Sequence, residues 1–185
     1  MITPFSIRPK PANKLAKYSA VACLGSAIIF VAVYMMIETY RGIVGVGALV
    51  FITAAVYIYN RYVCAQYSYD VAIDTSGDPI FVIRQTVGKR ETTLCRVDIS
   101  AIRAVKKLTC KEKKAYKSDS GTSVYCYYPT MRPEILYLVE VRCPYENADL
   151  FLELTDEHAS LLMSYAAEAR ALGSDIPTED TDSME

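Results

Sequence analysis

The sequence predicts an α+β protein in which a two-helix transmembrane hairpin precedes a seven-stranded antiparallel β-domain capped by a C-terminal α-helix. Three features of the 185 residues support this prediction. Two long runs near the N-terminus carry no charge, the stretch between residues 67 and 154 alternates apolar with polar residues, and a helical period follows it. We therefore expect four segments, which are a basic arm (1–17), the hairpin (18–62), the β-domain (67–172) and a disordered acidic tail (173–185).

The two uncharged runs have the length of membrane-spanning helices. The first, 18–37, has 20 residues and the second, 42–60, has 19. A helix of that length covers roughly 30 Å of hydrocarbon, and the short turn between the runs returns the chain through the same bilayer. Two alternatives fit less well, because a signal peptide has a shorter apolar core and a buried helix of a soluble protein shows a polar face.

Flanking charges predict how the hairpin is oriented. Four bases precede the first run, whereas the turn at 38–41 balances one Arg with one Glu. Because bases favour the cytoplasmic side, we expect a cell-membrane protein with both termini in the cytoplasm. The six cysteines are well separated and are expected to be reduced there. Tyrosines around Arg61 predict anchors at headgroup level, namely Tyr57, Tyr59, Tyr62 and Tyr67.

The β-domain is predicted from alternation and from turn residues. Its seven expected strands are 67–73, 80–87, 92–99, 102–108, 124–128, 135–143 and 150–154. The strand at 135–143 is the most apolar, so we expect it at the centre of its sheet. The polar stretch 109–123 is expected to be a loop, and Asp156 is expected to be the N-cap of the last helix, which ends at Gly173.

One segment resembles a known family. Between Val87 and Val105, a Gly-containing turn leads to a strand and then to apolar residues at Ile99, Ile102 and Val105. This pattern is similar to that of bacterial PH-like domains of the pleckstrin-homology superfold, which often follow two membrane helices. The resemblance implies a PH-like β-barrel or roll. The turn that carries bases in phosphoinositide-binding members corresponds here to 74–79, which has two acids and no base, so no such site is expected there.

A dense run of basic residues is the strongest candidate for a binding site. Seven bases occur within 15 residues, and they are Arg103, Lys106, Lys107, Lys111, Lys113, Lys114 and Lys117. Beside an anionic leaflet each base contributes about 1 kcal/mol to attraction. The alternative is a solvated loop that keeps a β-edge soluble. Nucleic acid is disfavoured, because residues 67–172 carry 14 bases against 15 acids.

Three tyrosines form a second candidate surface, for a partner peptide, and they are Tyr125, Tyr127 and Tyr128. Strand alternation puts Tyr125 and Tyr127 on one face, so core packing is the competing interpretation for half of them. His158, the single histidine, is expected to pack against the apolar face of the last helix. No catalytic residue, cofactor site or metal site is predicted, because no nucleophile has a base in a recognisable motif.

Two functional hypotheses follow from these observations. The first is a non-enzymatic membrane protein that acts as a scaffold or regulator, holding a membrane or cytoplasmic protein partner and also able to self-associate. The second is a sensor of anionic lipid that uses the basic run 103–117. An apolar groove beside the last helix favours the first hypothesis, and lysines that face the bilayer favour the second.

Overall fold

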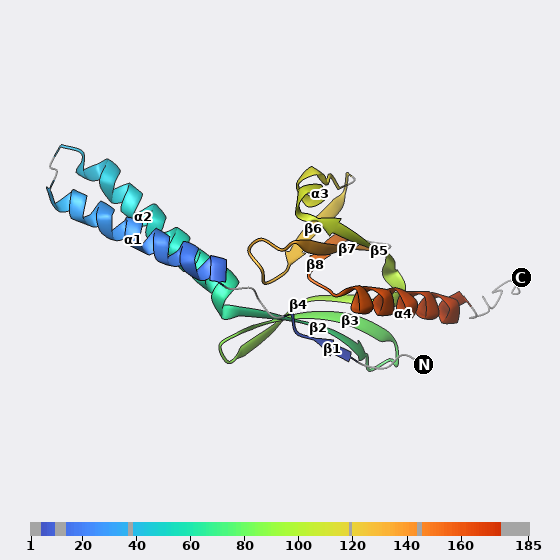
Figure 1. Ribbon diagram of the computed structural model, residues 1–185. Helices are drawn as coiled ribbons and strands as arrows, with labels where there is room; N and C mark the ends of the chain where they lie inside the picture. Colours follow the sequence, from blue (N-terminus) through green and yellow to red (C-terminus); the bar gives the residue numbers. More distant parts are fainter. Residues whose placement is uncertain (1–4, 10–13, 37–38, 119, 144–145, 175–185) are drawn as a thin grey trace, which may run out of the picture.

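An α+β fold is seen in the computed structural model (Figure 1), which describes residues 5–9, 14–36, 39–118, 120–143 and 146–174. Most of the predicted acidic tail, from residue 175 on, lies outside the described residues. The helices are α1 (Lys14–Met36), α2 (Arg41–Ile58), α3 (Cys110–Ala115) and α4 (Asp156–Ser174). The strands are β1 (Phe5–Ile7), β2 (Ala65–Ile73), β3 (Pro79–Val87), β4 (Arg90–Asp98), β5 (Ile102–Thr109), β6 (Thr122–Tyr127), β7 (Ile135–Arg142) and β8 (Asn147–Leu152). A π-helix, η1 (Tyr59–Cys64), continues α2, and a short 3₁₀ turn, η2 (Ile99–Ala101), precedes β5.

The helices α1 and α2 lie side by side as a hairpin, and each is long and apolar enough to span a membrane (Figure 1). Small and aromatic residues bring them together. A Cβ added at Gly47 would lie 2.7 Å from Cε1 of Phe30, whose ring centroid is 5.3 Å from that of Phe51. Because most other large apolar side chains of the hairpin point outward, its surface matches what a bilayer requires.

The first sheet has the order β1-β2-β3-β4, with all pairs antiparallel. Strands β2 to β4 form the predicted meander. The structure adds β1, which falls within the segment predicted as a basic arm. Phe5 of β1 pairs with Val71 of β2. The ring centroid of Phe5 lies 5.9 Å from that of Tyr165 and 6.1 Å from that of His158, both on α4. A strand of three residues is too short to leave a detectable alternation in the sequence.

The second sheet has the order β5-β7-β8-β6 and corrects the predicted seven-stranded barrel. The described residues form two open four-stranded sheets, with no closed barrel. Strand β6 pairs parallel with β8 at the edge, although it precedes β7 in the chain. The interior position goes to β7, as predicted, because both of its faces are apolar. Val139 is buried in the core between the sheets, and Leu138 is buried on the outer face.

The main core lies between the two sheets, and α4 runs along it (Figure 1). Leu162, Ala166 and Ala169 of α4 are buried in this core and close it. A smaller cluster covers the outer face of the second sheet. Its buried members are Leu136, Leu138 and Phe151, with Leu108, Tyr116, Cys126 and Tyr128 packed against them. Both layers are needed because β7 and β8 carry apolar side chains on both faces.

Two helix starts differ from prediction. The polar stretch expected to be a loop contains α3, which begins with a capping box formed by Thr109 and Glu112. On α4, the side chain of Thr155 accepts a hydrogen bond from the backbone N–H of His158 (3.3 Å), so Thr155 is the cap rather than Asp156. Asp156 instead accepts hydrogen bonds from the ammonium of Lys107 (2.7 Å) and the hydroxyl of Tyr137 (2.5 Å).

Candidate anion-binding cleft

The junction between hairpin and domain is held by Arg61 of η1. Its Nη2 donates to the carbonyl oxygen of Cys126 at 2.7 Å, and its Nη1 donates to the hydroxyl of Tyr67. The guanidinium also lies 5.6 Å from the centroid of the Tyr67 ring. Tyr67 is 1% exposed, so the prediction that it anchors in the headgroup region is wrong, because the π-helix turns the chain into β2 before it. Arg61 thus ties the last turn of the hairpin to β2 and to the end of β6.

A second contact fixes the end of β6. The buried hydroxyl of Tyr69 on β2 donates to the carbonyl oxygen of Tyr127 at 2.5 Å. Desolvation by burial raises the pKa of this phenol well above its ordinary value. With Arg61 on Cys126 and Tyr69 on Tyr127, the chain leaves β6 in a defined direction.

The loop after β6 carries side chains toward α3. The hydroxyl of Thr130, a buried residue, donates to Oε1 of Glu153 at 2.9 Å, which holds the loop against the chain that follows β8. Pro133 is buried, and Arg132 beside it is exposed. The loop therefore presents Arg132 on a fixed backbone.

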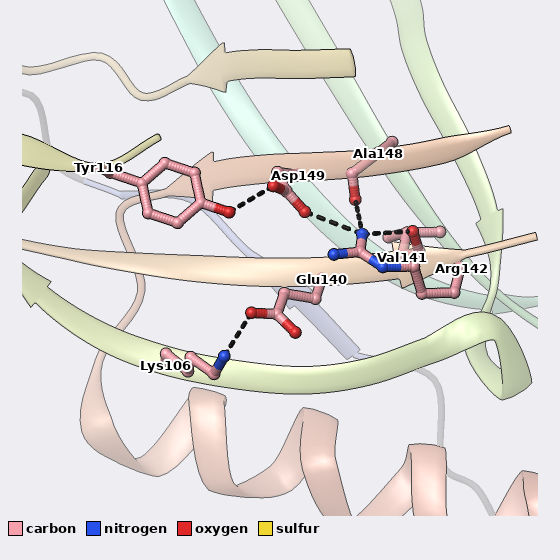
Figure 2. A network of polar contacts seen from close by, with 7 residues as sticks. All are labelled: Lys106, Tyr116, Glu140, Val141, Arg142, Ala148 and Asp149. Atoms are coloured by element: carbon pink, nitrogen blue, oxygen red, sulfur yellow. Dashed lines mark hydrogen bonds and ion pairs between the residues drawn. The ribbon is translucent and has the colours of Figure 1, made fainter. Parts of the chain in front are cut away.

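A polar network holds the chain after α3 on the outer face of the second sheet (Figure 2). Asp149 is 0% exposed, and Arg142 and Tyr116 approach its carboxylate from opposite sides in Figure 2. Nη1 of Arg142 donates to Oδ1 at 2.9 Å, and the hydroxyl of Tyr116 donates to Oδ2. Burial and this bond raise the pKa of Tyr116, and the bond with Asp149 raises that of Arg142. The ring of Tyr116 also meets Phe151 edge-on at 5.5 Å.

On α3, the capping box sets the direction of the lysines. The backbone N–H and hydroxyl of Thr109 donate to the Glu112 carboxylate, and these bonds lower its pKa. Lys113 then points inward. Its Nζ donates to the Tyr128 hydroxyl and lies 4.3 Å from that ring's centroid and 5.3 Å from that of Phe151. Burial, the largest single effect, lowers the pKa of Lys113, but the bond with Tyr128 and the interactions with Cys126 together outweigh it, so the net shift is upward and the amine stays charged.

Between α3 and the loop after β6 lies a cleft of about 500 Å³. Three cations line it, and they are Lys113, Lys114 and Arg132. Its other lining residues are Tyr128, Met131, Pro133 and Leu136. No acidic residue is among them, so the cleft combines a positive field with an apolar wall.

Only two of the seven predicted bases line this cleft. Lys106 pairs with Glu140 (2.5 Å), and Lys107 pairs with Asp156 (2.7 Å). The other three, Arg103, Lys111 and Lys117, are exposed and do not line it. The basic run is thus distributed over a strand and a capped helix, because alternation in β5 and the turn of α3 send neighbouring side chains in different directions.

Sequence reasoning missed Arg132 as a member of the site. It lies between Pro129 and Pro133, far from the basic run, and a lone Arg in a loop carries no signal by itself. The only clue is that two prolines restrict the backbone around it.

The predicted tyrosine surface divides in a similar way. Tyr125 and Tyr127 share a face and stack at 5.9 Å with an interplanar angle of 3°, and Tyr127 packs against the main core. Tyr128 joins the outer cluster and the cleft wall. The five cysteines with described side chains are free and half-buried.

A second concave surface lies beside α2. Ile52, Val56 and Tyr57 of the hairpin face Gln85 and Val87 of β3 across a groove of about 590 Å³. The turn between β3 and β4 therefore lies next to the last turns of α2, and Lys89 in this turn and Arg90 at the start of β4 are exposed.

The sequence matches no protein-family model and no curated protein. The geometry itself defines the kind of protein: a two-helix α+β protein with a basic cleft whose wall residue Tyr128 lies two residues after the Cys126 carbonyl that Arg61 binds. Among the described residues, no three His, Cys, Asp or Glu side chains are grouped as metal ligands.

Proposed function

We propose that this chain is an integral membrane protein whose hairpin spans the cell membrane and holds a binding domain against the bilayer surface, where the domain engages anionic lipid. The observation that carries the proposal is the pair of bonds from Arg61 to Tyr67 and Cys126. They join the end of the hairpin to the end of β6, two residues before Tyr128 in the cleft. A cleft attached in this way stays near headgroup level when the hairpin is in a bilayer.

The charges at this end of the domain support the proposal. The exposed bases are Lys114 and Arg132 in the cleft, Lys89 in the β3–β4 turn and Arg90 at the start of β4. Near an anionic leaflet each such base contributes about 1 kcal/mol, and salt screens the attraction over a Debye length of about 8 Å. The domain acts by binding, without chemistry of its own.

Topology is part of the proposal, with both termini in the cytoplasm. The pairing of β1 with β2 supports a common side for the N-terminal segment and the domain, and the four bases before and in the first turn of α1 support the cytoplasmic side. An impermeant thiol reagent added to intact cells should label Thr39→Cys in the hairpin turn and should spare Ser6→Cys in β1. Labelling of Ser6→Cys and protection of Thr39→Cys would reverse the orientation.

We also propose a distant relationship to the PH-like domains. The β2–β4 meander, the second sheet and the helix that closes the core support it. The parallel pairing of β6 with β8 is the feature in which this chain departs from a simple meander.

The test uses the full-length protein in lipid nanodiscs, either neutral or containing a fixed fraction of anionic lipid. Backbone amides of α3 and of the β3–β4 turn should exchange hydrogen several-fold more slowly in the anionic discs, and the difference should shrink at high salt. Equal exchange in both kinds of disc at low salt would refute lipid engagement.

A protein partner is the second candidate, and one observation favours it. Strands β4 and β6 are both sheet edges, and a groove of about 350 Å³ between them is lined by Leu94 and Val97 on one side and Tyr125 and Tyr127 on the other. An extended segment of a partner can pair with such an edge. Photo-crosslinking from Leu94 in native membranes should then capture a discrete partner, and a crosslinker placed at exposed Ile73 should not.

A further inference from the structure

The cleft differs from an ordinary basic surface because its cations come from two separate elements and meet around one space. Lys113 and Lys114 come from α3, and Arg132 comes from the loop after β6. Lys113 is half-buried, and the Tyr128 hydroxyl and the Cys126 side chain take up two of its three donors, so one remains for a ligand. Like charges that share a partly desolvated space repel each other, and a bound anion relieves this repulsion.

The walls of the cleft select for more than charge. Met131, Pro133 and Leu136 provide an apolar wall, and the volume of about 500 Å³ is in the range of small-molecule sites and exceeds what a lone phosphate ion fills. A ligand that fits has an anionic head and an apolar body attached to it.

The position of the cleft indicates where such a ligand comes from. Tyr128 forms one wall, and its neighbours Cys126 and Tyr127 are bonded to Arg61 and Tyr69. The nearest source of anionic amphiphiles for this end of the domain is the bilayer.

We infer that the cleft binds the terminal phosphate of a membrane lipid that carries a phosphomonoester headgroup, an inference that rests on the proposed engagement of anionic lipid. A phosphomonoester carries a charge of about −1.5 to −2 near neutral pH and three strong acceptor oxygens. Two ammonium groups and one guanidinium group provide enough donors and positive charge for a phosphomonoester, whereas a phosphodiester carries a single negative charge and fewer acceptor oxygens.

The experiment compares nanodiscs of equal headgroup charge that contain either a phosphomonoester lipid or a phosphodiester lipid, with the full-length protein in both. The readout is hydrogen exchange of the α3 amides as the lipid fraction rises. The variants are Lys114→Gln and Arg132→Gln in the cleft. Lys111→Gln is the matched control, because it removes the same charge from the same helix but lies outside the cleft. Circular dichroism confirms that each variant is folded.

The inference expects half-maximal protection at a lower fraction of the phosphomonoester lipid. Each cleft variant should raise that fraction about tenfold, since each removes a charge-assisted hydrogen bond, and Lys111→Gln should leave it unchanged. If Lys111→Gln weakens protection as much as Lys114→Gln and the two lipids act alike, the bases attract the anionic bilayer collectively and the cleft is not a specific site. The inference then fails, and the proposed function stands. If no anionic lipid slows exchange, both fail.

Two further arms separate the sources of the anion. Inorganic phosphate added to neutral discs should give little protection. Protection by phosphate equal to that by the lipid would assign the site to a soluble ligand and overturn the inference. A phosphorylated peptide is the last probe. If this peptide slows exchange of the α3 amides in neutral discs, and the phosphomonoester lipid does not slow it in mixed discs, the inference is overturned in favour of a protein ligand.

Discussion

Replacing Asp149 with alanine is expected to destabilise the β-domain by about 3 kcal/mol and to release the chain that follows α3 from the second sheet. Asp149 is fully buried and accepts hydrogen bonds from Arg142 and Tyr116 (Figure 2), so its removal leaves the Tyr116 hydroxyl without this acceptor and the Arg142 guanidinium with backbone carbonyls alone. Breaking a buried ion pair costs about 3–5 kcal/mol. The Arg142 side chain is 26% exposed and regains some hydration, which puts the expected cost at the lower end.

The assay is urea unfolding of the full-length protein in detergent, followed by circular dichroism at a wavelength where the β-sheets contribute. Apolar hairpin helices remain folded in the micelle, so the transition reports on the sheets. Tyr116→Phe serves as the smaller perturbation, because it removes one donor and leaves the ion pair, and we expect a loss of about 1–2 kcal/mol.

A double replacement separates the effect of leaving a buried charge unpaired from the effect of removing side-chain volume. Asp149→Leu with Arg142→Met removes both charges and keeps comparable volume, so it should be more stable than Asp149→Ala alone. Asp149→Ala with wild-type stability, or a double variant less stable than Asp149→Ala, would refute the view that this buried pair holds the outer face together.

Three other predictions concern the core, the hairpin and the response to pH. Leu162→Ala on α4 should cost about 3 kcal/mol in the same urea assay, because Leu162 is buried between the sheets; a cost near zero would mean that α4 does not close the core. Gly47→Ala should weaken hairpin packing by about 1–2 kcal/mol, since the new methyl meets the Phe30 ring, and Phe30→Leu should restore it, as measured by unfolding of the helices in a denaturing detergent. The hydrogen bonds from Lys107 and Tyr137 lower the pKa of Asp156. The stability that they add is therefore fully present above the ordinary pKa of 3.8 and is lost as the pH falls through the folded-state pKa. Lys107→Gln should flatten this acid dependence in melting experiments, and an unchanged acid profile would show that the pair does not contribute.

The hairpin was predictable because its signal is local. Hydropathy over about 20 residues decides whether a helix suits a bilayer, and both runs became helices of that kind. The β2–β4 meander was predictable for the same reason. Gly88, with φ of 63°, occupies a turn position that side chains disfavour, and alternating residues flank it.

The order of the second sheet was not predictable from local pattern. Strand β6 has ordinary alternation, and nothing in it specifies parallel pairing with β8, which follows it in the chain. The choice depends on β7, whose two apolar faces need cover on both sides and so exclude it from an edge. Strand β1 was missed because its pairing depends on Phe5 finding Tyr165 and His158 at the other end of the chain.

The basic run was visible in the sequence, but the tertiary structure decided which of its bases form ion pairs and which line the cleft. Lys106 and Lys107 found carboxylates 34 and 49 residues away, whereas Lys113 and Lys114 were joined by Arg132 from another loop. By itself the sequence determined the apolar helical hairpin, the α+β class and the positive charge, because each of these depends on neighbours along the chain. The tertiary structure alone decided which charges are neutralised and which converge, because ion pairs and clefts form between side chains that only the packing of the sheets brings within a few ångströms.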